Sequence, residues 1–146
     1  MPLKKVFIDT GAWYALKNLN DPNHKNAASF FQNLKGQVLC YTSDYVIDEA
    51  ITLTRTGLKN HHAASALAQE LLSEKAASII FVAPDYLARA LEIFQKFHDQ
   101  DFSFTDCTSF AIMEHLNIQE ALAFDGHFTF EKFGFSQISP EPHIRN

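Results

Sequence analysis

Short apolar runs recur along the chain, and longer segments with helical periodicity separate them. Four runs of three to five residues are typical of buried strands, and a further short strand is expected near the end of the chain. These runs cover residues 6–8, 38–41, 78–82, 121–124 and 135–138. Strands that alternate with helices predict an α/β protein with a mostly parallel central sheet flanked by helices in three layers. No linker or repeat interrupts the pattern, so the prediction is a single domain over residues 1–146.

The segments between the strands carry apolar residues three and four positions apart, which is the spacing of one helix face. Such stripes are Ala27, Phe30, Phe31 and Leu34; Ala64, Leu67, Ala68 and Leu71; and Ala90, Ile93, Phe94 and Phe97. Asp21 predicts an N-cap with Pro22 at the first helical position. Ser43 or Asp44 is expected to cap the next helix, and a later helix is predicted over 105–116.

Two acidic residues follow predicted strands. Asp9 comes directly after the apolar run at 6–8, and Asp125 directly after the run at 121–124. We expect Gly11 to allow a tight turn before a helix begins at Ala12. Because ligand sites in parallel sheets form just beyond the carboxyl ends of the strands, the pattern places both acids where a site is expected.

A third acid lies on a helix face that is otherwise apolar. Glu49 shares its spacing with Val46, Ala50 and Leu53, so it is predicted to lie on or beside a buried stripe. The adjacent Asp48 falls on the polar face of the same helix and is expected to be exposed.

Asp106 repeats this situation in the helix predicted near residue 105. It shares helical spacing with Phe110 and Met113 and also lies in the first turn, with Thr105 as the expected N-cap. A carboxylate there can serve the helix dipole, which contributes about 0.3–1 kcal/mol, so a capping role and a site role both stay open. Asp101, in the polar loop just upstream, is ambiguous.

The four acids Asp9, Glu49, Asp106 and Asp125 have few basic neighbours in the sequence. If they converge, they repel one another and raise one another's pKa, and a hard divalent cation such as Mg²⁺ or Mn²⁺ relieves the repulsion. Such a site suits metal-assisted attack of water on a phosphodiester. The formal net charge of −5 argues against a protein that binds nucleic acid through a basic face alone.

The cysteines and the hydropathy pattern bear on the cellular compartment. Cys40 and Cys107 both lie in apolar contexts without metal-ligand spacing, which favours buried free thiols and a reducing cytoplasm. No apolar run approaches the roughly 18 residues of a membrane span, and the run after Lys4 and Lys5 is too short for a signal peptide.

Histidines and exposed aromatic residues offer further candidates. We expect His127, two residues after Asp125, to be solvated or packed rather than part of the site. Trp13 and Tyr14 are of a type that can stack on an RNA base, but such side chains more often fill a core or a dimer contact.

Four sequence blocks resemble the acidic motifs of PIN-domain ribonucleases, with the VapC-like toxins as the nearest group. The blocks are FIDTGAWYAL (7–16), VIDEAITLTR (46–55), FSFTDCTSFAIM (102–113) and ALAFDGHFTFEKFGF (121–135). No block is specific by itself, but four in this order over residues 6 to about 138 form a specific pattern.

The resemblance implies a PIN-domain fold and a Mg²⁺- or Mn²⁺-dependent endoribonuclease that acts on single-stranded RNA. The residues that match the family's acidic positions are Asp9, Glu49, Asp106 and Asp125. It further implies that Thr10 supports the first acid, that Thr105 supplies a hydroxyl before the third, and that Asp101 contributes at the rim. Members of the toxin group also commonly form homodimers and bind a cognate antitoxin.

The resemblance also suggests how the acids share the work. Asp9 and Asp106 would hold the principal metal, directly or through waters. Glu49 and Asp125 would complete its shell and orient the attacking water.

Three other functions are weighed against this one. A non-catalytic PIN-like interaction module would retain the acids but bind metal weakly or not at all. A haloacid-dehalogenase-type phosphatase also uses an Asp at a strand end but needs a second Asp two positions later, where Gly11 stands. The DTG triplet at Asp9 also begins aspartic-protease motifs, but those proteins are all-β, whereas this pattern is largely helical.

Overall fold

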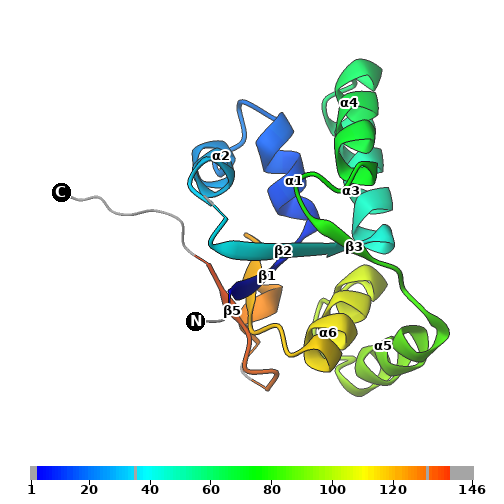
Figure 1. Ribbon diagram of the computed structural model, residues 1–146. Helices are drawn as coiled ribbons and strands as arrows, with labels where there is room; N and C mark the ends of the chain where they lie inside the picture. Colours follow the sequence, from blue (N-terminus) through cyan, green and yellow to red (C-terminus); the bar gives the residue numbers. More distant parts are fainter. Residues whose placement is uncertain (1–2, 35, 131, 139–146) are drawn as a thin grey trace.

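The computed structural model describes residues 3–34, 36–130 and 132–138. Five parallel strands form one central sheet with helices on both faces (Figure 1). The strands are β1 (Lys4–Ile8), β2 (Val38–Ser43), β3 (Ser78–Ile80), β4 (Glu120–Leu122) and β5 (Ser136–Gln137). The helices are α1 (Thr10–Lys17), α2 (His24–Gln32), α3 (Asp44–Gly57), α4 (His61–Leu72), α5 (Pro84–Lys96) and α6 (Phe104–Leu116), with a 3₁₀ turn, η1 (His127–Thr129). The predicted α/β architecture is confirmed.

The order of the strands, β3-β2-β1-β4-β5, determines where a site can form. The chain begins in the middle of the sheet, extends to one side through β2 and β3, and then crosses to the other side for β4 and β5. Helices α1, α2 and α4 lie on one face and α5 and α6 on the other (Figure 1). Ile8 pairs with Leu122, so β1 and β4 end side by side at the point where the order reverses. This carboxyl edge is where doubly wound sheets bind ligands.

A buried hydrogen-bond chain fixes α1 against the end of β1. The indole Nε1 of Trp13 donates to Oγ1 of Thr42 at 3.2 Å, and the Thr42 hydroxyl donates to the carbonyl of Ile8 at 3.0 Å. Trp13 is only 1% exposed and stacks on Phe31. The core role of Trp13 is therefore confirmed, and no face of its ring is open to a base.

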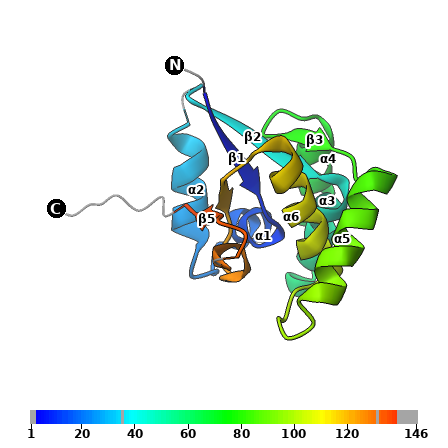
Figure 2. The ribbon, with the colours of Figure 1, turned by 90° about the horizontal axis from the view of Figure 1, so that it is seen from below.

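Aromatic side chains attach the segment after β4 to α6. Phe110 of α6 packs edge-to-face on Phe128 of η1, with ring centroids 5.0 Å apart, and lies 4.8 Å from Phe133. Phe102, just before α6, packs edge-to-face on Phe130 and on the ring of His127. Figure 2 shows this orange segment beside the yellow α6. The packing fixes the residues after β4 relative to the start of α6.

Several boundaries differ from the sequence prediction. The helix predicted to begin at Pro22 begins at His24, because the side chain of Asp21 accepts the amide of Asn23 in a preceding turn instead of capping the helix. Strand β4 ends at Leu122, so Asp125 follows it by three residues rather than one. Ser43 caps α3 as predicted, with its hydroxyl accepting the amide of Val46 at 3.1 Å.

The prediction of a turn at Gly11 is wrong, because α1 already begins at Thr10 and Gly11 is its second residue. The two cysteines are buried free thiols, as predicted, and burial raises the pKa of each to about 11. Across the described ranges, no helix combines the length and the apolar character that a membrane crossing requires.

Candidate active site

A cavity of about 350 Å³ opens at the carboxyl edge of the sheet, beside the ends of β1 and β4. Its lining residues are Asp9, Thr10, Gly11, Glu49, Leu53, Asp101, Ser103, Asp106, Asp125 and His127. The four acids singled out in the sequence therefore meet in one place, together with Thr10 and Asp101. Thr105 does not line this cavity, and Ser103 does instead.

One wall of the cavity, the α1–α3 wall, consists of Asp9, Thr10 and Glu49. Asp9 comes directly after β1, and its backbone carbonyl accepts the first amide hydrogen bonds of α1. The hydroxyl of Thr10 donates to Oε1 of Glu49 at 2.6 Å, which joins the start of α1 to the middle of α3. Glu49 is half-buried, whereas Asp48 is exposed, as the helical spacing predicted.

The opposite wall, the α6–η1 wall, consists of Asp106, Asp125 and His127. Asp106 is the third residue of α6, and the N-cap is Ser103 rather than the expected Thr105. The Ser103 hydroxyl accepts the amide of Asp106 at 2.9 Å, and Oδ2 of Asp106 accepts the amide of Ser103 at 3.0 Å. Asp106 thus fulfils both of the roles left open, because it caps α6 and also lines the cavity.

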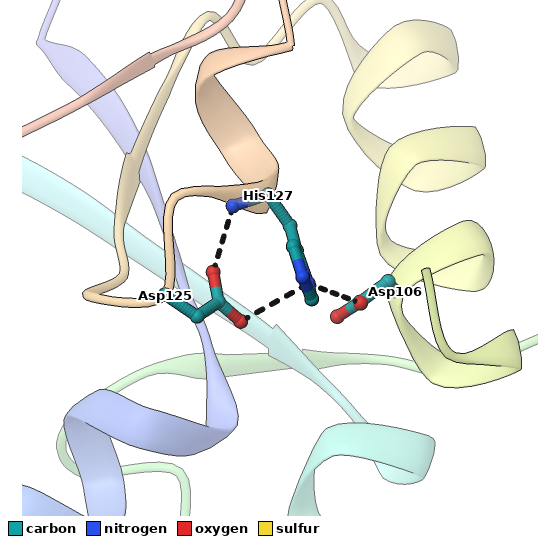
Figure 3. Close-up of side chains that lie close together, drawn as sticks. All are labelled: Asp106, Asp125 and His127. Carbon is teal, nitrogen blue, oxygen red and sulfur yellow. Dashed lines mark hydrogen bonds and ion pairs between the residues drawn. The ribbon is translucent and has the colours of Figure 1, made fainter. Parts of the chain in front are cut away.

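His127 links the two acids of the α6–η1 wall (Figure 3). Its Nδ1 lies 2.7 Å from Oδ2 of Asp106 and 3.4 Å from Oδ2 of Asp125. Because an ionised carboxylate only accepts hydrogen bonds, Nδ1–H is the donor to Asp106. Asp125 in turn accepts the backbone amide of His127 at 3.0 Å.

The expectation that His127 lies outside the site is wrong. The only sequence signal was its position two residues after Asp125. Its contact with Asp106, 21 residues away in sequence, follows from the aromatic packing on α6.

Burial and mutual repulsion make two of the acids resist ionisation. Asp9 is 3% exposed, and its pKa is raised well above the usual value by burial first, then by the charges of Asp125 and Asp106. Asp106 is 6% exposed, and burial also raises its pKa, against the opposing effects of the Ser103 amide and of His127. A bound cation would favour the ionised forms of both the Asp9 and the Asp106 carboxyl groups.

The lining fits a divalent cation. One ligand atom each from Asp106, Asp125 and His127 lies within 4.8 Å of the others. Among the residues that the structure describes, no Lys or Arg lines this cavity and could neutralise the carboxylates. Carboxylate-rich sites of this kind select hard cations such as Mg²⁺ and Mn²⁺. The arrangement can therefore bind a cation and hold water and a phosphate oxygen beside it.

Comparisons with known proteins agree with this fold. The family model "PIN domain" matches residues 6–135. The 23S rRNA-specific endonuclease VapC20 of Mycobacterium tuberculosis is 35% identical over 136 residues, which cover 93% of this chain and 99% of that protein, in both strains compared.

Two solved structures share the architecture. The crystal structure of Mycobacterium tuberculosis VapC20, described as a sarcin-ricin loop cleaving toxin, matches with a TM-score of 0.83 and 34% identity over 92% of this chain and 99% of that one. The structure of FitAB bound to an IR36 DNA fragment matches with a TM-score of 0.62 over 97% of this chain and 98% of that one, and at 16% identity it supports the fold alone. The sequence blocks, the topology and these matches together show that the chain belongs to the PIN-domain family.

Proposed function

We propose that this chain is a divalent-metal-dependent endoribonuclease that hydrolyses phosphodiester bonds of RNA, and that it is the toxin of a toxin–antitoxin pair. The observation that carries the proposal is the meeting of Asp9, Glu49, Asp106 and Asp125 in one cavity at the switch point of the sheet. The similarity to a 23S rRNA-specific endonuclease over nearly its whole length supports RNA as the substrate.

The metal, Mg²⁺ or Mn²⁺, would be held mainly by Asp9 and Asp106, with Glu49 and Asp125 completing its shell and orienting water. When bound, such an ion polarises the phosphate and lowers the pKa of a coordinated water. Asp9 and Asp106 are buried carboxylates with raised pKa values, so the ion also relieves the cost of ionising them.

The protein's other groups hold the acids in position. The Thr10 hydroxyl restrains Glu49, and the imidazole of His127 restrains Asp106 and Asp125. Hydrogen bonds of this kind orient metal ligands and raise metal affinity. Asp101, exposed at the cavity, adds negative charge at the rim, and we assign it no direct contact with the metal.

The proposed partners follow from the same family. They are an RNA substrate, a cognate antitoxin that blocks the cavity and a second copy of the chain in a homodimer. Sedimentation of the purified protein, alone and with the product of a neighbouring reading frame, tests the two protein partners. If the protein sediments as a monomer and does not bind that product, RNA is left as the sole proposed partner.

The function is tested by incubating the purified protein with 23S rRNA, or with a hairpin that reproduces the sarcin-ricin loop, in the presence of Mn²⁺ or Mg²⁺. We expect cleavage that EDTA abolishes and that the Asp9→Asn variant lacks. Cleavage that is identical with EDTA, or equal in Asp9→Asn, would refute the mechanism. Calorimetry separates the remaining alternative, because a non-catalytic module would release no heat with millimolar Mn²⁺.

A further inference from the structure

Gly11 occupies a helical position where the fold does not require glycine. It is the second residue of α1, its φ lies outside the left-handed region, and a Cβ built there would meet no atom within 4 Å. By contrast, a Cβ at Gly57 would lie 2.7 Å from the hydroxyl of Tyr14. Alanine forms helices better than glycine. Neither backbone conformation nor packing requires glycine at Gly11, and the open space beside it lies in the lining of the cavity.

Leu53 lines the same cavity, and its side chain is not part of the buried hydrophobic core. It is 37% exposed and follows Glu49 by one helical turn, on the same face of α3. The hydrogen bond from Thr10 to Glu49 holds the two helices together at this point. Gly11 follows Thr10 directly and Leu53 follows Glu49 by one helical turn, so both lie near this hydrogen bond in the lining of the cavity.

The cavity therefore combines a buried acidic part with an uncharged border. A nucleotide has the matching division, because its phosphate is charged whereas its base has flat, weakly polar faces. The phosphate needs the cation that the acids hold, and the neutral part of the nucleotide avoids the carboxylates.

We propose that Gly11 and Leu53 form the subsite for the nucleoside next to the scissile phosphate. The bare backbone of α1 at Gly11 gives the nucleoside room, and the side chain of Leu53 packs on it. The inference rests on the proposed ribonuclease function. Neither residue carries a hydrogen-bonding side chain, so their side chains do not distinguish one base from another.

The test enlarges Gly11 and shortens Leu53. In Gly11→Ala and Gly11→Leu we expect a KM for RNA that rises with side-chain size, by about tenfold or more in the leucine variant, with kcat and Mn²⁺ affinity unchanged. The melting temperature of Gly11→Ala should equal or exceed that of the wild type. Leu53→Ala should also raise KM, whereas Leu72→Ala, which shortens an exposed leucine at the end of α4, should not.

A binding measurement keeps this inference separate from the proposed function. Fluorescence anisotropy of a labelled RNA hairpin with Mn²⁺ in the Asp125→Asn background, which keeps the principal ligands Asp9 and Asp106 but loses the acid that orients the water, reports binding without cleavage. Adding Gly11→Leu should weaken this binding by about the same factor as it raises KM. If the wild type fails to cleave RNA, the proposed function fails but this measurement still stands. If Gly11→Leu binds RNA as tightly as the wild type does and has the same KM, the subsite is overturned. A variant that loses only kcat or only Mn²⁺ affinity would also overturn it.

Discussion

The two walls of the cavity hold their acids by different means. In the α1–α3 wall a hydroxyl donates to one acid, Glu49, while Asp9 lies buried beside the pair. In the α6–η1 wall an imidazole lies between Asp106 and Asp125 and lowers the pKa of Asp106 against the effect of burial. No basic group is among the causes of the raised pKa of Asp9. The α6–η1 wall therefore carries an internal basic partner for its acids, whereas a cation from outside the protein would favour the ionised form of Asp9.

The largest effect is expected from removing the central charge of the α6–η1 wall. Asp106→Asn keeps an oxygen that can accept the amide of Ser103, so α6 stays capped, but it loses the negative charge that binds the metal. We expect the transition state to lose about 4 kcal/mol of metal-dependent stabilisation, which corresponds to single-turnover cleavage about 10³-fold slower. A melting curve checks that the fold survives. Cleavage within tenfold of the wild type would remove Asp106 from the metal site.

The next largest effect is expected from the histidine that links that wall. His127→Ala should weaken Mn²⁺ binding by about 10–100-fold, because the hydrogen bond to Asp106 is lost. His127→Asn should lose less, since its side-chain N–H lies near the position of Nδ1. Isothermal titration calorimetry measures both. His115→Ala serves as a control, since that histidine pairs with Tyr86 and lies outside the cavity. Equal losses in the alanine and asparagine variants would mean that His127 acts by something other than this hydrogen bond.

A smaller effect is expected when the hydroxyl of the α1–α3 wall is removed. Thr10→Val preserves the shape of the side chain but leaves Glu49 without its donor, and a hydrogen bond to a charged group contributes about 1.5 kcal/mol or more. Cleavage should fall about tenfold, while Thr10→Ser stays close to the wild type. Steady-state cleavage of the same RNA hairpin compares the two variants. If Thr10→Ser loses as much activity as Thr10→Val, the hydroxyl alone does not account for the role of Thr10.

The smallest effect concerns stability without metal. The folded pKa of Asp9 is raised, so its ionisation destabilises the native state as pH rises from the ordinary carboxyl pKa through the folded one. Asp9→Asn should therefore melt higher than the wild type at pH 7 in EDTA, by about 2–4 °C for each kcal/mol relieved. The difference should vanish well below the ordinary carboxyl pKa of about 4, where both states of the wild type are protonated. Thermal melts in EDTA measure it, and a much lower melting temperature for the variant would show that Asp9 is structural.

With Mn²⁺ in place of EDTA, the wild type should melt at a higher temperature than Asp9→Asn. A ligand that binds only the native state raises the melting temperature by an amount that grows with the logarithm of its affinity, so Mn²⁺ should stabilise the wild type and have little effect on Asp9→Asn. Equal stabilisation of both proteins would place the cation away from Asp9.

Much of the fold was predictable because local signals agree with the tertiary structure. The run before Asp9 is buried in the middle of the sheet, and Ser43 caps α3 as its position suggested. Two of the errors occur where a side chain bonds to a nearby backbone amide. Asp21 forms a turn instead of a cap, and Ser103 rather than Thr105 caps α6. Several Asp and Ser side chains compete for these amides, and sequence alone does not decide among them.

The sequence by itself determined the α/β layering and which acids point inward, because periodicity separates Glu49 from Asp48 and places Asp9 at the end of a strand. Only the tertiary structure decided that His127 joins the site, because aromatic packing on α6 brings it to Asp106. The tertiary structure also shows that Gly11 is a helical residue with open space beside it, rather than the turn residue that the sequence predicted. Both depend on contacts between segments far apart in the chain, which no local pattern encodes.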